Sequence, residues 1–267
     1  MKCLVINLDR SAQRLRHVRQ AFARLNLDFE RVGAIDGASL PEETVTQFNA
    51  RNEWLRPLTK AEAGCLLSHR KCWEAVAAGE EPYAAVFEDD MQISALAQPL
   101  LRSSDWIPQG VDFVKLETRK RAVVVGWTAR RVSPGHRLTR LHSFHDGLGG
   151  YILSRSSARW LCSQIPERTA PVDQLVLNPQ FGIFQRLNVY QLTPSICIPQ
   201  QLAQGADDRL DAMPSTIDPD GNLYVSDQSL QQRSRSTTSA VQRELARMAA
   251  SLQRAATGRK RVRIPYR

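Results

Sequence analysis

A short apolar run that ends in three consecutive carboxylates is the feature that most constrains how this chain can fold. Residues 83–87 read Tyr-Ala-Ala-Val-Phe, and Glu88, Asp89 and Asp90 follow directly. A run of this length, rich in β-forming residues, is typical of a buried strand in an α/β sheet. The three carboxylates should then lie where the strand leaves the sheet, which is where α/β proteins bind ligands.

Two interpretations of Glu88, Asp89 and Asp90 are open from these residues alone. Adjacent carboxylates repel one another, so their placement needs a compensating cation, basic side chains or water. A hard divalent cation such as Mg²⁺ or Mn²⁺ prefers oxygen ligands of this kind. A solvated acidic turn after a core strand is the alternative.

The N-terminal residues predict a strand, a loop and a helix. Residues 3–7 are apolar and indicate a buried strand, and Ser11 is placed to cap a helix that runs to about Leu25. The loop 7–10 would lie at the carboxyl end of the strand. Each of two residues here has a structural alternative that is as good as a ligand-binding role. Asp9 could cap the helix, and Arg14 could be a solvated helix residue.

The next segments predict a second strand and a long helix. The strand lies within residues 28–35 and ends at Asp36-Gly37, an ordinary turn signal. Thr59 and Glu62 form a capping box that opens a helix closed by Gly79. His69 falls inside this helix, where a lone histidine is more often structural than catalytic.

A glycine-rich loop precedes a further strand at residues 151–153. Gly149 and Gly150 permit close approach of the backbone to a ligand, although such loops are also common connectors. Strands are predicted at 111–116, 122–125 and 189–192, and a helix from Ser156 or Ser157. Asp173 stands near another helix start, where N-capping is the alternative to a chemical role.

Charge is distributed very unevenly along the chain. Ten of the 36 basic residues but only one of the 27 acidic residues lie in 232–267, so the rest of the chain is neutral and the net charge of +9 belongs to its end. From about residue 204 the composition predicts a linker or disorder, with an amphipathic basic helix over 239–256. Such a helix fits an anionic membrane surface, a partner helix or nucleic acid.

Cysteine usage and the first residues bear on the compartment. The five cysteines are widely spaced and form no CxxC pair, which predicts reduced core residues rather than a metal or disulfide framework. The start of the chain has too short an apolar core for a signal peptide, so we expect a cytoplasmic protein.

Taken together, these motifs resemble glycosyltransferase family 25, the bacterial lipooligosaccharide galactosyltransferases and their collagen-modifying relatives. Their order and spacing agree with the family from residue 2 to about 200. The matching stretches are residues 5–11 with Arg14, 34–37, 59–65 with Ser68 and His69, 87–90, 149–154, 172–173 and 199–200.

The resemblance implies a GT-A fold, a Rossmann-like mixed α/β sheet flanked by helices, over residues 1–203. Residues 204–267 would form a linker and a basic, partly helical or disordered C-terminal tail. The resemblance also implies an inverting, metal-dependent transfer of a hexose, with galactose as the first candidate, from a UDP-sugar to a saccharide or glycolipid acceptor such as the lipooligosaccharide or lipopolysaccharide core. The basic tail would then hold the enzyme peripherally at the inner membrane, where such acceptors lie.

The same resemblance assigns roles to individual residues. Glu88 and Asp90 would hold Mn²⁺ (or Mg²⁺), and Asp173 is the candidate base that takes the proton of the acceptor hydroxyl. The donor-binding residues would be Asn7, Leu8, Asp9, Arg14, Asp36 and Asp89, and those bordering the acceptor Gly149, Gly150 and Tyr151. The rival hypotheses are a non-catalytic member of the fold that binds a nucleotide sugar or a partner, and a basic nucleic-acid-binding protein, which the neutral body disfavours.

Overall fold

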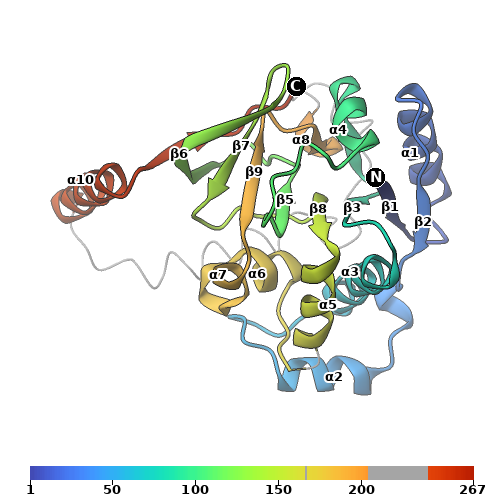
Figure 1. Cartoon of the computed structure of the whole chain (residues 1–267). Coiled ribbons are helices and arrows are strands. Elements are labelled where there is room, and N and C mark those ends of the chain that lie inside the picture. The colour runs from blue at the N-terminus through green and yellow to red at the C-terminus, as the bar shows by residue number, and fades with distance from the viewer. Residues whose placement is uncertain (166, 204–239) are drawn as a thin grey trace.

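A nine-stranded mixed sheet organises the computed structural model, which describes residues 1–165, 167–203 and 240–267 (Figure 1). The strand order is β11-β6-β7-β9-β5-β8-β3-β1-β2. The strands of this sheet are β1 Lys2–Asn7, β2 Glu30–Gly33, β3 Tyr83–Glu88, β5 Phe113–Lys115, β6 Ala122–Ser133, β7 His136–Leu141, β8 Gly150–Ser154, β9 Val189–Thr193 and β11 Arg259–Arg263. A small second sheet pairs β4 Met91–Ile93 with β10 Cys197–Pro199.

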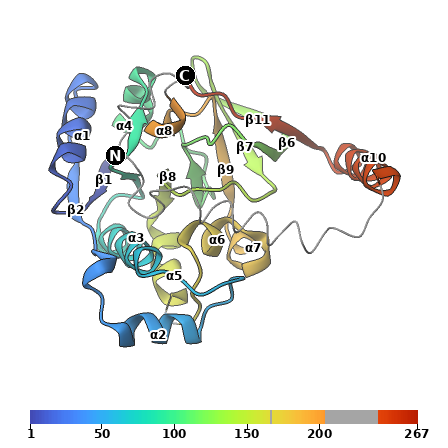
Figure 2. The same cartoon turned by 180° about the vertical axis from the view of Figure 1, so that it is seen from behind.

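Helices cover both faces of the main sheet (Figures 1 and 2). The α-helices are α1 Ala12–Arg24, α2 Glu42–Ala50, α3 Lys60–Ala78, α4 Gln98–Arg102, α5 Arg155–Gln164, α6 Val172–Leu177, α7 Ile183–Arg186, α8 Gln200–Ala203 and α10 Ala240–Ala256. Three short 3₁₀ helices, η1 Gly37–Ser39, η2 Ala95–Ala97 and η3 Pro179–Phe181, complete the connections. The predicted mixed α/β sheet flanked by helices is therefore confirmed.

Strand β3 lies deep in the sheet, with β1 parallel on one side and β8 antiparallel on the other. Its side chains alternate between two cores. Ala84 and Val86 belong to the cluster that α3, α5, α6 and α7 cover, and Ala85 and Phe87 to the cluster that α1 and α4 cover. Both faces of β3 are thus buried, which explains the unbroken apolar run before the carboxylates.

Most predicted elements are confirmed, with shifts at their ends. The capping box of α3 is present, since Thr59 Oγ1 accepts from the Glu62 backbone N–H and Glu62 accepts from that of Thr59. Helix α1 follows Ser11, but the Ser11 side chain makes no capping hydrogen bond to the described residues. Helix α5 begins at Arg155, one or two residues before the predicted start, because Ser154 caps it.

The strand predicted at residues 122–125 is much longer, running to Ser133 as the first half of a hairpin with β7. Gly135, with φ of +84°, makes the turn. Most of the added residues, among them Arg130 and Arg131, are exposed, so no apolar alternation revealed them in the sequence.

The C-terminal residues depart from the tail that the sequence predicts. Arg259–Arg263 form β11, which pairs antiparallel with β6 at the edge of the main sheet, and Ile264 is buried in the core. Val262 and Ile264 alternate with basic residues, and this weak period-two pattern lies hidden in a run of positive charge. Helix α10, predicted over 239–256, is observed over Ala240–Ala256 and projects away from the sheet (Figure 1). The predicted linker at 204–239 lies outside the described residues.

Two further expectations concern cysteines and membranes. All five cysteines, each within the described part of the chain, are free thiols. Among the described residues no helix has the length and apolar character needed to cross a bilayer.

Candidate active site

The parallel pairing of β1 with β3 brings two loops together at one edge of the sheet. Ile6 is in register with Glu88, so the loop after Asn7 and the carboxylates after Phe87 leave the sheet side by side. Strand β2, parallel on the other side of β1, adds the segment that leads to Asp36. The sequence prediction that these motifs meet at the carboxyl ends of strands is confirmed.

A cavity of about 390 Å³ opens at this edge. Its walls come from the ends of β1, β2 and β3 and from the first three turns of α3. They are lined by Ile6, Asn7, Leu8, Arg10, Arg14, Ala34, Ile35, Asp36, Gly37, Ala38, Lys60, Ala61, Cys65, Ser68, His69, Glu88, Asp89 and Asp90. The volume and the mixture of apolar walls with a few polar groups are those of small-molecule sites.

Asp9 is the one predicted donor-binding residue that does not line this cavity. Its side chain is 90% exposed and pairs with Arg31 at the surface. The hydrogen bond and charge of Arg31 lower the pKa of Asp9. The structure therefore does not support direct donor contact by Asp9, because its position after the strand turns the carboxylate outward.

Asp89 is a buried anchor at the base of the cavity. Its carboxylate accepts a hydrogen bond of 2.7 Å from Asn7 Nδ2 and one of 3.0 Å from Arg14 Nη1. Burial raises the pKa of Asp89, and the Asn7 and Arg14 contacts partly offset that rise. Asp89 thereby fixes the orientation of two other residues that line the cavity.

Asp36 serves a local structural purpose as well as lining the cavity. Its Oδ1 accepts from the Ala38 backbone N–H and caps η1, and its other oxygen pairs with Arg10. The turn interpretation of Asp36-Gly37 is thus correct, and Arg10 joins the cavity as a basic group that the sequence did not single out.

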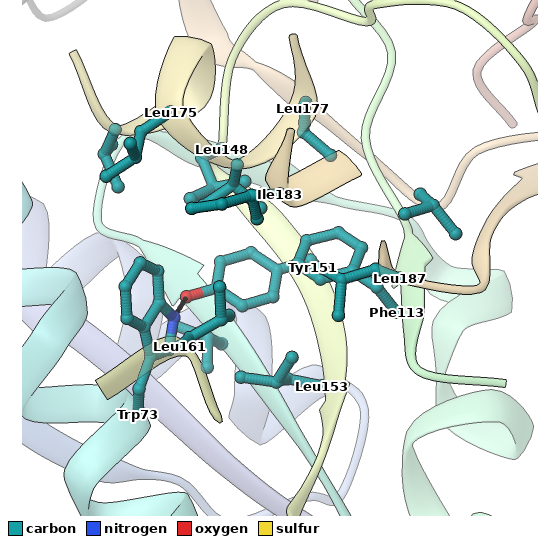
Figure 3. Packing of buried hydrophobic residues seen from close by; sticks show 14 of the residues in the cluster. Trp73, Phe113, Leu148, Tyr151, Leu153, Leu161, Leu175, Leu177, Ile183 and Leu187 are labelled. Carbon is teal, nitrogen blue, oxygen red and sulfur yellow. Dashed lines mark hydrogen bonds between the residues drawn. The ribbon is translucent and has the colours of Figure 1, made fainter. Parts of the chain in front are cut away.

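Glu88 ends a hydrogen-bonded chain that starts in the core. Trp73 Nε1 donates to Tyr151 Oη over 2.8 Å, His69 Nδ1 lies 3.0 Å from the same hydroxyl, and His69 Nε2 lies 3.0 Å from Glu88 Oε1. Figure 3 shows Trp73 and Tyr151 facing each other within the apolar cluster. Because Trp73 can only donate, the Tyr151 hydroxyl is free to donate to His69 Nδ1, which leaves Nε2–H for Glu88.

The two ends of the acidic trio differ in pKa. Burial disfavours ionisation of Glu88, but the hydrogen bond and charge of His69 and the charge of Arg119 outweigh it, so the pKa of Glu88 is lowered. Burial, and next the charge of Glu88, raise the pKa of Asp90 to about 7. Asp90 Oδ1 is buried and has no hydrogen-bond partner within the described residues. An unpartnered buried carboxylate oxygen beside an ionised carboxylate fits a divalent-cation site.

Gly149, Gly150 and Tyr151 are buried packing residues outside the cavity lining, which does not support their assignment to the acceptor. Tyr151 is fully buried. A Cβ on Gly150 would lie 2.3 Å from Cys197 Sγ, and one on Gly149 would lie 2.5 Å from Met91 Sδ. The close approach that these glycines permit is made by the protein's own side chains rather than by a ligand.

Asp173 lies at the start of α6 and is held by backbone groups. Its Oδ2 accepts from the Gly147 N–H over 2.9 Å and its Oδ1 from the Gln174 N–H over 2.8 Å. Burial raises the pKa of Asp173, the Gly147 contact lowers it, and Asp146 raises it further. Asp173 does not line the described cavity.

A buried charge cluster that sequence reasoning missed lies beside these carboxylates. Lys115 and Glu117 are both fully buried and pair over 2.6 Å, and Arg119 lies 3.4 Å from Asp146. Arg119 influences the pKa of Glu88, Asp90 and Asp173. The only sequence signal was charged residues alternating through the end of an apolar strand, Val-Lys-Leu-Glu-Thr-Arg.

This protein has a mixed α/β sheet with a carboxylate-rich cavity at the carboxyl ends of its parallel strands. The fold and the site thus define its class, the α/β proteins that bind a ligand at this edge of the sheet. The model of glycosyltransferase family 25, described as an LPS biosynthesis protein, matches residues 1–176. The chain belongs to glycosyltransferase family 25, as its motifs predict.

Individual relatives come from Neisseria and Haemophilus. The chain is 28% identical over 229 residues to the lacto-N-neotetraose biosynthesis glycosyltransferase LgtB of Neisseria gonorrhoeae, covering 82% of this chain and 81% of that protein. It is 25% identical over 203 residues to the lipooligosaccharide biosynthesis protein lic2B of Haemophilus influenzae, covering 73% and 74%.

Solved structures offer more distant likenesses. A glycosyltransferase involved in glycosylation of the major capsid of PBCV-1 is 10% identical with a TM-score of 0.40, covering 80% of this chain and all of that one. The galactosyltransferase LgtC is 11% identical with a TM-score of 0.36, covering 72% and 73%. At these TM-scores neither likeness bears on the site.

Proposed function

We propose that this protein transfers galactose from UDP-galactose to a saccharide acceptor of lipooligosaccharide, with inversion at the anomeric carbon. The observation that carries the proposal is the cavity where the ends of β1, β2 and β3 meet, which combines basic side chains with Glu88 and Asp90. The names of LgtB and lic2B support the acceptor class.

The donor would lie along the loop after β1. Arg10, Arg14 and Lys60 line the cavity and supply positive charge for a diphosphate. Leu8 and Ile35 offer apolar wall for the nucleoside, and Asp36 offers a carboxylate oxygen for a ribose hydroxyl.

Glu88 and Asp90 would hold a divalent cation, Mn²⁺ (or Mg²⁺). The fit rests on the unpartnered Asp90 Oδ1 and on two carboxylates that face the same cavity. When bound, such a cation supplies Lewis-acid stabilisation of the departing diphosphate. His69 keeps Glu88 ionised and oriented for this purpose.

Asp173 is our candidate for the base that takes the proton of the attacking acceptor hydroxyl. Its raised pKa makes it a stronger base than a surface carboxylate, and the Gly147 N–H holds its orientation. Arg119 nearby would compensate the charge of the buried carboxylates.

The activity is tested by UDP release from UDP-galactose with Mn²⁺ and a lactosyl or glucosyl acceptor, with the product anomer read by NMR. A β-linked product from the α-linked donor supports inversion. Saturable UDP binding without turnover, across a panel of donors and acceptors, would favour the non-catalytic alternative.

Two variants test the assigned carboxylates. Asp90→Ala should abolish Mn²⁺-dependent turnover and Mn²⁺ binding by electron paramagnetic resonance while circular dichroism stays unchanged. Asp173→Asn should lower kcat far more than it raises the donor KM. The exposed Asp105→Asn is the matched control and should behave as wild type. A change in donor KM alone would make Asp173 a binding residue.

We also propose that α10 and β11 rest on an anionic membrane. Met248 and Leu252, one turn apart on α10, are 58% and 71% exposed, and Arg259, Lys260, Arg261 and Arg263 are exposed on β11. No acidic residue follows Glu244. Apolar side chains beside unopposed cations suit a phospholipid surface, and they are of little use for nucleic acid.

Flotation with vesicles tests this membrane proposal. The protein should bind phosphatidylglycerol vesicles and not phosphatidylcholine vesicles, and the double variant Met248→Ser and Leu252→Ser should lose binding at unchanged charge. The exposed Leu96→Ser is the control. If the double variant binds the vesicles as well as wild type does, charge alone drives the binding, and a contribution from Met248 and Leu252 is refuted.

A further inference from the structure

Cys65, His69 and Glu88 form a second potential metal site in the cavity wall. Cys65 and His69 are four residues apart on α3 and therefore share a face of the helix, and Glu88 ends the neighbouring strand β3. One ligand atom from each residue lies within 4.8 Å of the other two. All three residues line the cavity, with Cys65 and Glu88 partly exposed and His69 buried behind them.

We propose that these three side chains bind Zn²⁺ in a site that shares Glu88 with the proposed Mn²⁺ site. A thiolate, an imidazole and a carboxylate are the ligand types of zinc, whereas Mn²⁺ and Mg²⁺ favour oxygen donors. Three protein ligands facing a cavity leave the fourth tetrahedral position for water.

The surroundings of His69 support its role as a ligand. Ligating histidines almost always hydrogen-bond through their second ring nitrogen, which fixes the ring. His69 Nδ1 lies 3.0 Å from Tyr151 Oη, and Trp73 holds that hydroxyl in place. With Nε2 on the ion, Nδ1–H would donate to Tyr151.

The environment of Cys65 selects which cation can enter. Burial and the nearby carboxylates, Glu88 first among them, raise the pKa of the Cys65 thiol well above its usual range. A cysteine ligand gives up its proton on binding, and it does so for cations that bond strongly to sulfur. This excludes Mg²⁺ and disfavours Mn²⁺.

Sharing Glu88 makes the two ions mutually exclusive. Zn²⁺ drawn toward Cys65 and His69 takes a carboxylate that the proposed Mn²⁺ site requires. Zinc would then inhibit transfer by displacing manganese. This consequence rests on the proposed function, whereas zinc binding itself does not.

The experiment uses Co²⁺ as an optical substitute for Zn²⁺ on the full-length protein. One equivalent of Co²⁺ should produce a thiolate-to-cobalt charge-transfer band, and Zn²⁺ should abolish it. Cys65→Ser and Cys65→Ala should lose the band, and the buried Cys72→Ser on the same helix should keep it. Tyr151→Phe should weaken Co²⁺ binding about 10–100-fold. Absence of the band in wild type, or its survival in both Cys65 variants, would overturn the site.

Shared use of Glu88 is tested with Mn²⁺ by electron paramagnetic resonance. Zn²⁺ should release bound Mn²⁺ from wild type but not from Cys65→Ala, and Asp90→Asn should lose Mn²⁺ while keeping the cobalt band. Simultaneous binding of Zn²⁺ and Mn²⁺ would refute the overlap. None of these measurements depends on turnover, so a failed UDP-release assay leaves them interpretable.

Discussion

Gly150 on β8 and Cys197 on β10 are in direct contact, so closely that a Cβ on the glycine would lie 2.3 Å from the cysteine sulfur. Gly150→Ala should therefore destabilise the protein by about 1–3 kcal/mol through overpacking. Urea unfolding measures this loss. Gly33→Ala is the matched control, because nothing lies within 4 Å of its added methyl, and it should stay within about 0.5 kcal/mol of wild type. Equal effects of the two variants would contradict the packing role.

Tyr151→Phe should cost about 1–3 kcal/mol of unfolding free energy. The variant keeps the ring but leaves the buried Trp73 N–H without its acceptor and His69 without its hydroxyl partner. Tyr190→Phe is the control, since the Tyr190 hydroxyl has no hydrogen bond to any described residue. If Tyr151→Phe left the free energy of unfolding nearly unchanged, the hydrogen bonds that run from Trp73 to Glu88 would not stabilise the fold.

His145 should make stability depend on pH. Burial, and next the charge of Lys115, lower its pKa to about 3, whereas the unfolded value is near 6.5. Below pH 6.5 the unfolded chain therefore binds a proton at His145 that the folded protein does not. The contribution of neutral His145 to the free energy of unfolding is complete above pH 6.5 and is lost progressively as pH falls toward 3. The slope from this residue approaches about 1.4 kcal/mol per pH unit. Unfolding of His145→Gln between pH 5 and pH 7.5 should show a shallower slope than wild type, and an identical slope would contradict the assignment.

Ile264→Ala should destabilise the protein by about 2–5 kcal/mol, because Ile264 is buried beyond the end of β11 in the main core. Val262→Ala, on the same strand but half-buried, should cost clearly less. Differential scanning fluorimetry compares the two. Equal small effects would mean that the C-terminal strand does not belong to the cooperative fold.

Much of the architecture follows from local sequence patterns. The apolar runs of β1 and β3, the capping box at Thr59 and Glu62 and the Gly79 stop are short-range signals, and each element formed where its signal stands. The register of β1 with β3 then follows from parallel pairing, so the meeting of Asn7 with Asp89 could be anticipated.

The edge strand β11 could not be anticipated in the same way. It is paired with β6, more than 120 residues earlier in the chain, and Val262 is its one apolar residue. A strand whose exposed face is entirely basic carries too little hydrophobic periodicity to be separated from a solvated tail.

The sequence by itself determined the acidic trio at a strand end, the helix that faces it and the family to which the chain belongs, because those features are written in contiguous residues. Only the tertiary structure decided what each carboxylate does. Asp89 became an anchor because Asn7 and Arg14 reach it, and Asp9 turned to solvent. Glu88 acquired a partner in His69, a residue of α3 that lies 19 positions earlier in the chain. Such roles depend on distances and burial between segments remote in the chain, and these are set by packing rather than by any local pattern.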